Sequence, residues 1–105
     1  MNAYEGVDDV LDALGDPTRR AVLELLRGGE RSVGALAGCL PVSRPAVSQH
    51  LRILKGAGLV RERRDGTRRL YRVDPEGLAV LRTYLESYWS DVLAAFKDAA
   101  EGGQR

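Results

Sequence analysis

The chain has one cysteine, Cys39, and one histidine, His50, among its 105 residues. A single cysteine excludes an intramolecular disulfide and is typical of a protein from a reducing cytoplasm. A zinc site needs about four ligands, mostly Cys or His. This chain cannot supply them, even shared between two copies, unless carboxylates take half of the places. We therefore expect no metal ion and no other cofactor.

Long apolar runs and a secretion signal are also missing. Residues 1–5 carry neither a basic stretch nor an apolar run, so we expect no signal peptide, and no segment approaches the roughly 20 apolar residues of a membrane span. The length, with 44% hydrophobic and 30% charged residues, predicts one soluble cytoplasmic domain over 1–105. We find no nucleophile–base pair, phosphate loop or paired-carboxylate motif, which argues against an enzyme.

Charge is unevenly distributed although the net charge is only +1. Residues 1–16 hold five acidic residues and no basic one, and residues 74–105 hold six acidic and three basic residues. The middle, 17–73, holds thirteen Lys and Arg against four acidic residues. This arrangement indicates that the middle of the chain faces a polyanion and that the ends have another role.

The stretch from Ser43 to Lys55 is expected to form a DNA-recognition helix. Ser43 is a good N-cap, and Pro45 is tolerated in the first turn. Val47, Leu51 and Leu54 follow helical spacing and should be buried. The opposite face carries Pro45, Ser48, Gln49 and Arg52. The Ser, Gln and Arg side chains on it can hydrogen-bond base edges and phosphates.

A basic hairpin is predicted directly after this helix, over 59–73. Asp65-Gly66 is a strong hairpin signal because glycine adopts a positive φ at little cost. The hairpin carries six arginines against two acidic residues. A solvated edge usually carries mixed charge or Lys, so arginines in this number favour contact with phosphates or a groove. We interpret the hairpin as the wing of a winged helix-turn-helix.

Three helices are expected before the recognition helix. Apolar spacing predicts a helix over 7–14, and Asp16-Pro17 predicts the start of another that ends near Leu26. Ser32 should cap a short helix from Val33 to about Cys39, which completes the helix-turn-helix. The fold class is therefore mainly α with a small two-stranded antiparallel wing and five helices, in the order helix-helix-helix-helix-strand-strand-helix.

The last helix is expected from Pro75 to about Ala100, followed by a frayed tail over 102–105. Its apolar stripe is too long for so small a core to cover. We expect helices 7–14 and 75–100 to form a dimer interface, while complete burial inside one chain is the alternative. The expected interface residues are Val7, Val10, Leu11, Leu14, Leu81, Leu85, Tyr88, Trp89, Val92 and Phe96.

Three separated blocks resemble the ArsR/SmtB family of bacterial winged-helix repressors: Leu14 to Arg20, Ser43 to Leu54, and Ala57-Gly58-Leu59-Val60. The resemblance covers roughly residues 5–100. It implies a homodimer through the first and last helices that binds an imperfect palindrome near a promoter, usually as a repressor. It places Ser43, Arg44, Ser48, Gln49 and His50 on the helix that reads the major groove, and the Asp65-Gly66 hairpin in the wing.

The chain departs from the metal sensors of that family. Their usual Cys-x-Cys site, within a Glu-Leu-Cys-Val-Cys-Asp-Leu pattern, corresponds here to Ser32 and Gly34, neither of which is a soft ligand. The other common site needs histidines on the last helix, which has none. His50 is better read as a helix residue that bonds backbone or phosphate, and Cys39 as a half-buried small residue.

These observations predict a homodimeric repressor that binds a palindromic double-stranded operator and does not respond to metal. Arg44, Ser48 and Gln49 are expected to read bases. We expect the phosphates or the minor groove to be contacted by Arg52, Arg63, Arg64, Arg68 and Arg69. The alternatives are a protein-interaction module and a repressor that responds to an organic ligand or to thiol oxidation.

Overall fold

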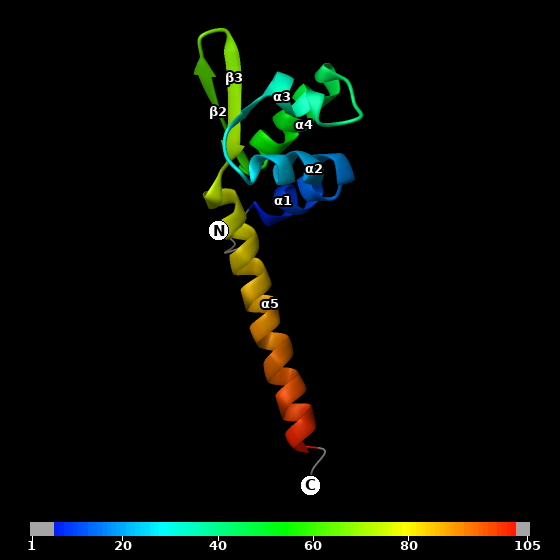
Figure 1. The fold of residues 1–105 in the computed structure, drawn as a ribbon. Helices are drawn as coiled ribbons and strands as arrows, with labels where there is room; N and C mark the ends of the chain where they lie inside the picture. The colour runs from blue at the N-terminus through cyan, green and yellow to red at the C-terminus, as the bar shows by residue number, and fades with distance from the viewer. Residues whose placement is uncertain (1–5, 103–105) are drawn as a thin grey trace.

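The computed structural model describes residues 6–102. Its elements, in order, are α1 (Val7–Leu14), α2 (Pro17–Leu26), β1 (Arg31–Ser32), α3 (Val33–Gly38), α4 (Arg44–Gly56), β2 (Val60–Asp65), β3 (Arg68–Val73) and α5 (Pro75–Gly102). Five helices and a hairpin wing confirm the expected fold class and helix order (Figure 1). In Figure 1 the wing and the α3–α4 region lie at one end, and α5 projects from the other.

The sheet has one strand more than the sequence predicts. The two-residue strand β1 pairs antiparallel with β3, with Arg31 opposite Tyr71 and Ser32 opposite Leu70. The strand order is therefore β1-β3-β2, rather than an isolated two-stranded wing. A strand this short leaves no alternation to detect, and its partner lies far along the chain. Its effect is to anchor the base of the wing to the start of α3.

The expected helix caps are confirmed. Asp16 Oδ1 accepts hydrogen bonds from the backbone N–H of Thr18 at 2.7 Å and of Arg19 at 3.1 Å. Ser32 Oγ accepts from Ala35 N at 3.1 Å, and Ser43 Oγ from Ala46 N at 3.2 Å. Each bond satisfies an N–H that the first turn leaves free, so α2, α3 and α4 begin at residues that local sequence determines.

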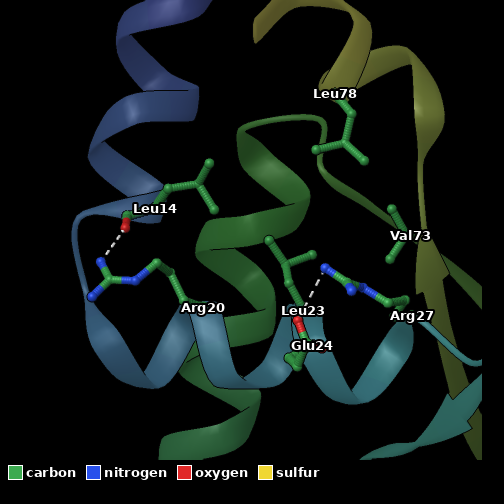
Figure 2. A pocket seen from close by; sticks show the side chains of 7 residues that line it. All are labelled: Leu14, Arg20, Leu23, Glu24, Arg27, Val73 and Leu78. Atoms are coloured by element: carbon green, nitrogen blue, oxygen red, sulfur yellow. Dashed lines mark hydrogen bonds and ion pairs between the residues drawn. The ribbon is translucent and has the colours of Figure 1, made fainter. Parts of the chain in front are cut away.

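Two arginines at the start of α2 bind the end of α1. Arg19 Nε donates to the Ala13 carbonyl at 2.6 Å, and Arg20 Nη1 donates to the Leu14 carbonyl at 2.6 Å (Figure 2). The last carbonyls of a helix lack intrahelical partners, and cations are favourable there. Side chains of α2 thus satisfy carbonyls at the end of α1.

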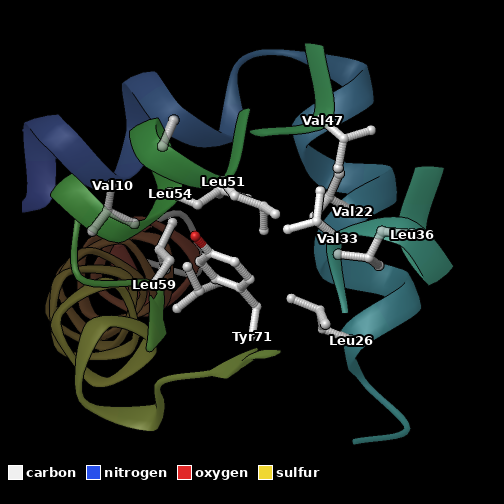
Figure 3. Close-up of a cluster of buried hydrophobic side chains, with 12 residues drawn as sticks. Val10, Val22, Leu26, Val33, Leu36, Val47, Leu51, Leu54, Leu59 and Tyr71 are labelled. Atoms are coloured by element: carbon white, nitrogen blue, oxygen red, sulfur yellow. The ribbon is translucent and has the colours of Figure 1, made fainter. Parts of the chain in front are cut away.

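The core lies between α2, α3, α4 and the base of the wing (Figure 3). Val47, Leu51 and Leu54 of α4 are fully buried, as their helical spacing predicts. The ring of Tyr71 enters the cluster from β3 (Figure 3). The other fully buried large side chains are Val10, Val22, Leu26, Leu36 and Leu59. Because α4 buries one face here, its opposite face is held rigidly outward.

Helix α5 packs against α1 at its start and then leaves the rest of the protein (Figure 1). Its 28 residues span about 42 Å at 1.5 Å per residue. This explains the elongated extents of 68 × 32 × 21 Å. Gly102 belongs to α5, and the rest of the tail expected to fray lies outside the described residues. None of the helices described here is both long and apolar enough to cross a membrane.

Candidate nucleic-acid interface

The outer face of α4 is open to solvent. Ser48, Gln49 and Arg52 are exposed, whereas Val47 and Leu51, their neighbours in sequence, are fully buried. Within residues 6–102, Arg44 and Arg52 form no ion pair. The helix therefore presents a hydroxyl, an amide and two unpaired guanidinium groups, all of which can bond base edges or phosphates.

A groove runs between α4 and the wing. Its outer part is a cavity of about 470 Å³ lined by Ser32, Val33, Gly34, Arg44, Ser48, Thr67, Arg68 and Arg69. Its inner part, about 200 Å³, is lined by Val33, Ser48, Arg52, Lys55, Glu62, Arg69 and Tyr71. The two parts share Val33, Ser48 and Arg69. We call this combined feature the basic groove, because five of its lining residues are Arg or Lys and one is acidic.

The wing arginines do not share one face. In the β2–β3 register, Arg64 stands opposite Arg69, and Glu62 stands opposite Tyr71. Because side chains alternate along a strand, these four side chains lie on one face of the hairpin, the face that turns toward α4. Arg63 stands opposite Leu70 on the other face. Of the four wing arginines expected to contact DNA, the register thus places Arg64 and Arg69 on the groove face. Arg68 reaches the groove from the turn.

Arg63 is engaged by an acidic residue far away in sequence. Its Nη2 and Nε donate to Glu30 Oε1 at 2.6 Å and Oε2 at 3.1 Å, a two-point contact. The hydrogen bond from Arg63 lowers the pKa of Glu30, which keeps that carboxylate ionised. Arg68 donates to Asp65 at 3.0 Å across the exposed turn. The structure therefore engages Arg63 and Arg68 with carboxylates, whereas Arg64 forms no ion pair within residues 6–102.

Glu62 is the acidic residue inside the basic groove. Its Oε2 accepts from the Tyr71 hydroxyl at 2.7 Å and lies 3.6 Å from Lys55 Nζ, and its Oε1 lies 4.0 Å from Arg69 Nε. The Tyr71 hydrogen bond lowers the pKa of Glu62. Its negative charge holds Lys55 of α4 and Arg69 of the wing on either side of one carboxylate. This role does not follow from the sequence, because only the fold brings the three residues together.

Three other expected DNA contacts occupy different positions. Ser43 is exposed, but its oxygen already caps α4. The guanidinium of Arg44 lies beside the start of α3, where its Nη1 would be 3.9 Å from a Cβ on Gly34. His50 is only partly exposed, and its buried Nδ1 has no hydrogen-bond partner among the described residues. The structure therefore groups Arg44 with the groove and sets His50 apart from Ser48 and Gln49.

Cys39 is exposed, which corrects the expectation of a half-buried residue. It lies at the end of α3, in the turn before α4, where the chain does not cover it.

Ser32 and Gly34, the positions that correspond to the metal-binding cysteines of the family's sensors, line the basic groove. Across residues 6–102, no group of three or more His, Cys, Asp or Glu could hold a metal ion.

The residues expected at a dimer interface divide into two groups. Val7 and Val10 are buried inside the protomer at 6% and 1% exposure, and Leu14 and Leu81 are partly buried against the core. For Val7 and Val10 the structure corrects the expectation, because the first helix turns these residues toward its own core. The exposed group comprises Leu11, Leu85, Tyr88, Trp89, Val92 and Phe96, and the structure adds Leu78 and Leu93.

A second, more apolar depression lies where α1, α2, β3 and α5 meet (Figure 2). It measures about 350 Å³ and is lined by Leu14, Arg20, Leu23, Glu24, Arg27, Val73 and Leu78. Arg27 Nη2 pairs with Glu24 at 3.3 Å, and Arg20 binds the Leu14 carbonyl, so both arginines have partners. This depression shares no lining residue with the basic groove.

Comparisons with known proteins agree with this geometry. A family model described as a helix-turn-helix domain matches residues 14–63. The HTH-type transcriptional regulator Rv2034 of Mycobacterium tuberculosis is 53% identical over 91% of this chain and 90% of its own length. The transcriptional repressor SdpR of Bacillus subtilis is 42% identical over 57% of this chain and 67% of its own.

The fold has a solved counterpart in the homodimeric winged helix-turn-helix DNA-binding domain Mb0332 of Mycobacterium bovis, a possible ArsR-family transcriptional regulator. The solution structure of this domain matches with a TM-score of 0.67 and 36% sequence identity, over 85% of this chain and 82% of that one.

Proposed function

The chain belongs to the ArsR/SmtB family of winged helix-turn-helix transcriptional regulators, and we propose that it acts as a homodimeric repressor of a palindromic operator. The observation that carries this proposal is the exposed outer face of α4, with Ser48, Gln49 and Arg52, beside the basic groove. In this arrangement α4 enters the major groove and the wing follows the backbone or the minor groove. SdpR is named as a transcriptional repressor, which supports repression rather than activation as the mode of regulation.

Dimerisation is the second part of the proposal. The far half of α5 leaves its apolar side chains exposed, with Trp89 at 63% and Phe96 at 72%. Apolar patches of this kind mark association surfaces, and the Mycobacterium bovis counterpart is homodimeric. Two recognition helices about 34 Å apart would then meet half-sites one DNA turn apart.

Independence from metal is the third part. The two positions at which metal sensors of the family carry cysteines hold Ser32 and Gly34. The Ser32 oxygen caps α3, and Gly34 has no side chain to ligate with. The residues do not fit the family's zinc or arsenic chemistry, which needs soft ligands. The operator complex is therefore proposed to persist when zinc is added.

The test is binding of the purified protein to the DNA upstream of its own gene, followed by fluorescence anisotropy at several salt concentrations, with and without Zn²⁺. We expect tight binding that weakens with salt and is indifferent to zinc. Release by zinc would contradict metal independence. Absence of binding to any duplex would contradict the DNA-binding function and favour a protein-interaction module.

Base reading is tested separately with Gln49→Ala. A bidentate amide contact to a base contributes about 1–3 kcal/mol of discrimination, so the variant should lose affinity by that amount on the operator and relax its preference. The measurement is competition by operators with single base changes. An unchanged preference would remove Gln49 from base reading.

A further inference from the structure

We propose that the outer part of the basic groove is a seat for one phosphate oxyanion, which a backbone phosphate of the operator fills in the complex. The inference rests on the DNA-binding function proposed above and names the part of the groove that holds the backbone. The donors are the guanidinium groups of Arg44 and Arg69, the Ser48 hydroxyl and the Ser32 hydroxyl. Arg68 closes the seat from the wing turn.

The chemistry of the lining fits a phosphate. Arg44 has no ion pair within residues 6–102. Arg69 has one long ion pair, with its Nε 4.0 Å from Glu62 Oε1, and so keeps guanidinium donors for a phosphate. The Ser32 oxygen accepts from Ala35 N, so its hydroxyl hydrogen is left to donate. The Arg68–Asp65 pair is exposed on both sides, and such pairs contribute little, so Arg68 can change partner readily. Charge-assisted bonds from guanidinium to phosphate are the strong kind.

The position of the cavity fits the shape of DNA. The sugar-phosphate backbone separates the major groove from the minor groove. A protein that places α4 in the major groove and the wing turn at the minor groove must straddle that backbone. The cavity lies between these two elements, lined by Arg44 and Ser48 of α4 and by Thr67 and Arg68 of the wing turn. The DNA backbone should therefore pass over the arginines that line the cavity.

The start of α3 makes room for the seat. The atoms nearest to an ideal Cβ on Gly34 belong to the Arg44 guanidinium and the Ser32 hydroxyl, with Arg44 Nη1 at 3.9 Å. The positions that carry metal-binding cysteines in the sensors of the family thus line an anion site here. A side chain at Gly34 would enter the cavity beside the Arg44 guanidinium.

This gives a matched pair of variants, Gly34→Asp and Gly38→Asp. Both add one carboxylate to α3 at an exposed position, but a Cβ on Gly38 has no neighbour within 4 Å. Circular dichroism and thermal melting first establish that each variant folds. Arg44→Gln serves as a second variant that removes a donor without adding charge.

The first readout is anisotropy on upstream DNA between about 50 and 200 mM salt. For Gly34→Asp and Arg44→Gln we expect about tenfold weaker binding or more, and a salt slope reduced by about one. Gly38→Asp should change affinity less than about twofold, as surface substitutions do. Equal losses in Gly34→Asp and Gly38→Asp would overturn the seat, because a general charge effect would explain them.

The second readout is calorimetric titration of inorganic pyrophosphate into the protein without DNA. Saturable binding that Gly34→Asp abolishes, while Gly38→Asp retains it, would show that the seat also takes a free phosphate. No pyrophosphate binding, together with the selective DNA loss, would show that only the DNA backbone fills it. If no variant or wild type bound DNA but pyrophosphate binding still depended on Gly34, the seat would stand and the DNA-binding function would fall. Failure of both readouts to separate the two aspartate variants overturns the proposal.

Discussion

The backbone at Gly77 lies directly against the backbone at Gly58. A Cβ built on Gly77 would overlap the Gly58 carbonyl oxygen and lie 2.6 Å from the carbonyl carbon and 3.1 Å from Leu59 N. Nearby, Asp74 N donates to the Leu59 carbonyl at 2.8 Å. The start of α5 is therefore fixed to the turn that ends α4.

Gly77→Ala is expected to destabilise the protein by about 3 kcal/mol, the upper end of the range for overpacking, because two backbones must separate. Urea denaturation followed by circular dichroism measures the change. Gly56→Ala is the control: Gly56 ends α4 and has no neighbour within 4 Å, so alanine should be neutral or stabilise by up to about 1 kcal/mol. Equal stability of the two variants would mean that the contact is not close.

Asp74 is expected to make stability depend on pH in the acid range. The hydrogen bond from Arg61 Nε, at 3.0 Å, lowers the pKa of Asp74 in the folded protein below the unfolded value of about 3.9. Its contribution is then fully present above the unfolded pKa, and it is lost as the pH falls through the lowered folded pKa. Asp74→Asn should be less stable than wild type at neutral pH, and the two should converge in acid. Urea midpoints measured from pH 7 downward check this, with Asp98→Asn, an exposed change on α5, as control.

Local signals account for what the sequence predicts well. The caps at Asp16, Ser32 and Ser43 act within three residues, and the Asp65-Gly66 turn needs only one positive φ, which Gly66 adopts at 64°. The buried face of α4 follows from helical spacing alone. Such features depend on neighbours in the chain, so one sequence contains enough information to predict them.

Long-range partners account for what the sequence does not predict. Arg63 and Glu30 are 33 residues apart, and the pairing of β1 with β3 brings Arg31 to Tyr71. Six arginines in a hairpin indicate a polyanion, but they do not tell which of them the protein itself engages. Likewise, nothing local distinguishes Gly77 from the other glycines. These features exist only once the sheet and α5 are in place.

Substitutions on the two faces of the wing should differ in their effect on DNA binding. Arg69→Ala is expected to weaken binding to every duplex and to lower the salt slope by about one, because Arg69 lines the basic groove. Arg63→Ala should leave the slope unchanged and alter stability instead, since Arg63 makes its two-point contact with Glu30. Anisotropy against salt and urea denaturation on both variants give the comparison. A lowered slope in Arg63→Ala alone would place the opposite face of the wing on the DNA.

Trp89 should report dimerisation directly, because it is the single tryptophan and is 63% exposed in the protomer. If α5 pairs with a second copy, the fluorescence emission of Trp89 should be blue-shifted at high protein concentration. On dilution it should shift to the red, because the indole passes from an apolar interface to water. Trp89→Glu would place a charge in that interface and should give a monomer in analytical ultracentrifugation, with weaker operator binding. Ser90→Glu adds the same charge one position along α5, about 100° around the helix, and should remain dimeric. A dimer that survives Trp89→Glu as fully as Ser90→Glu would exclude this face of α5, and the apolar stripe would then need a different partner.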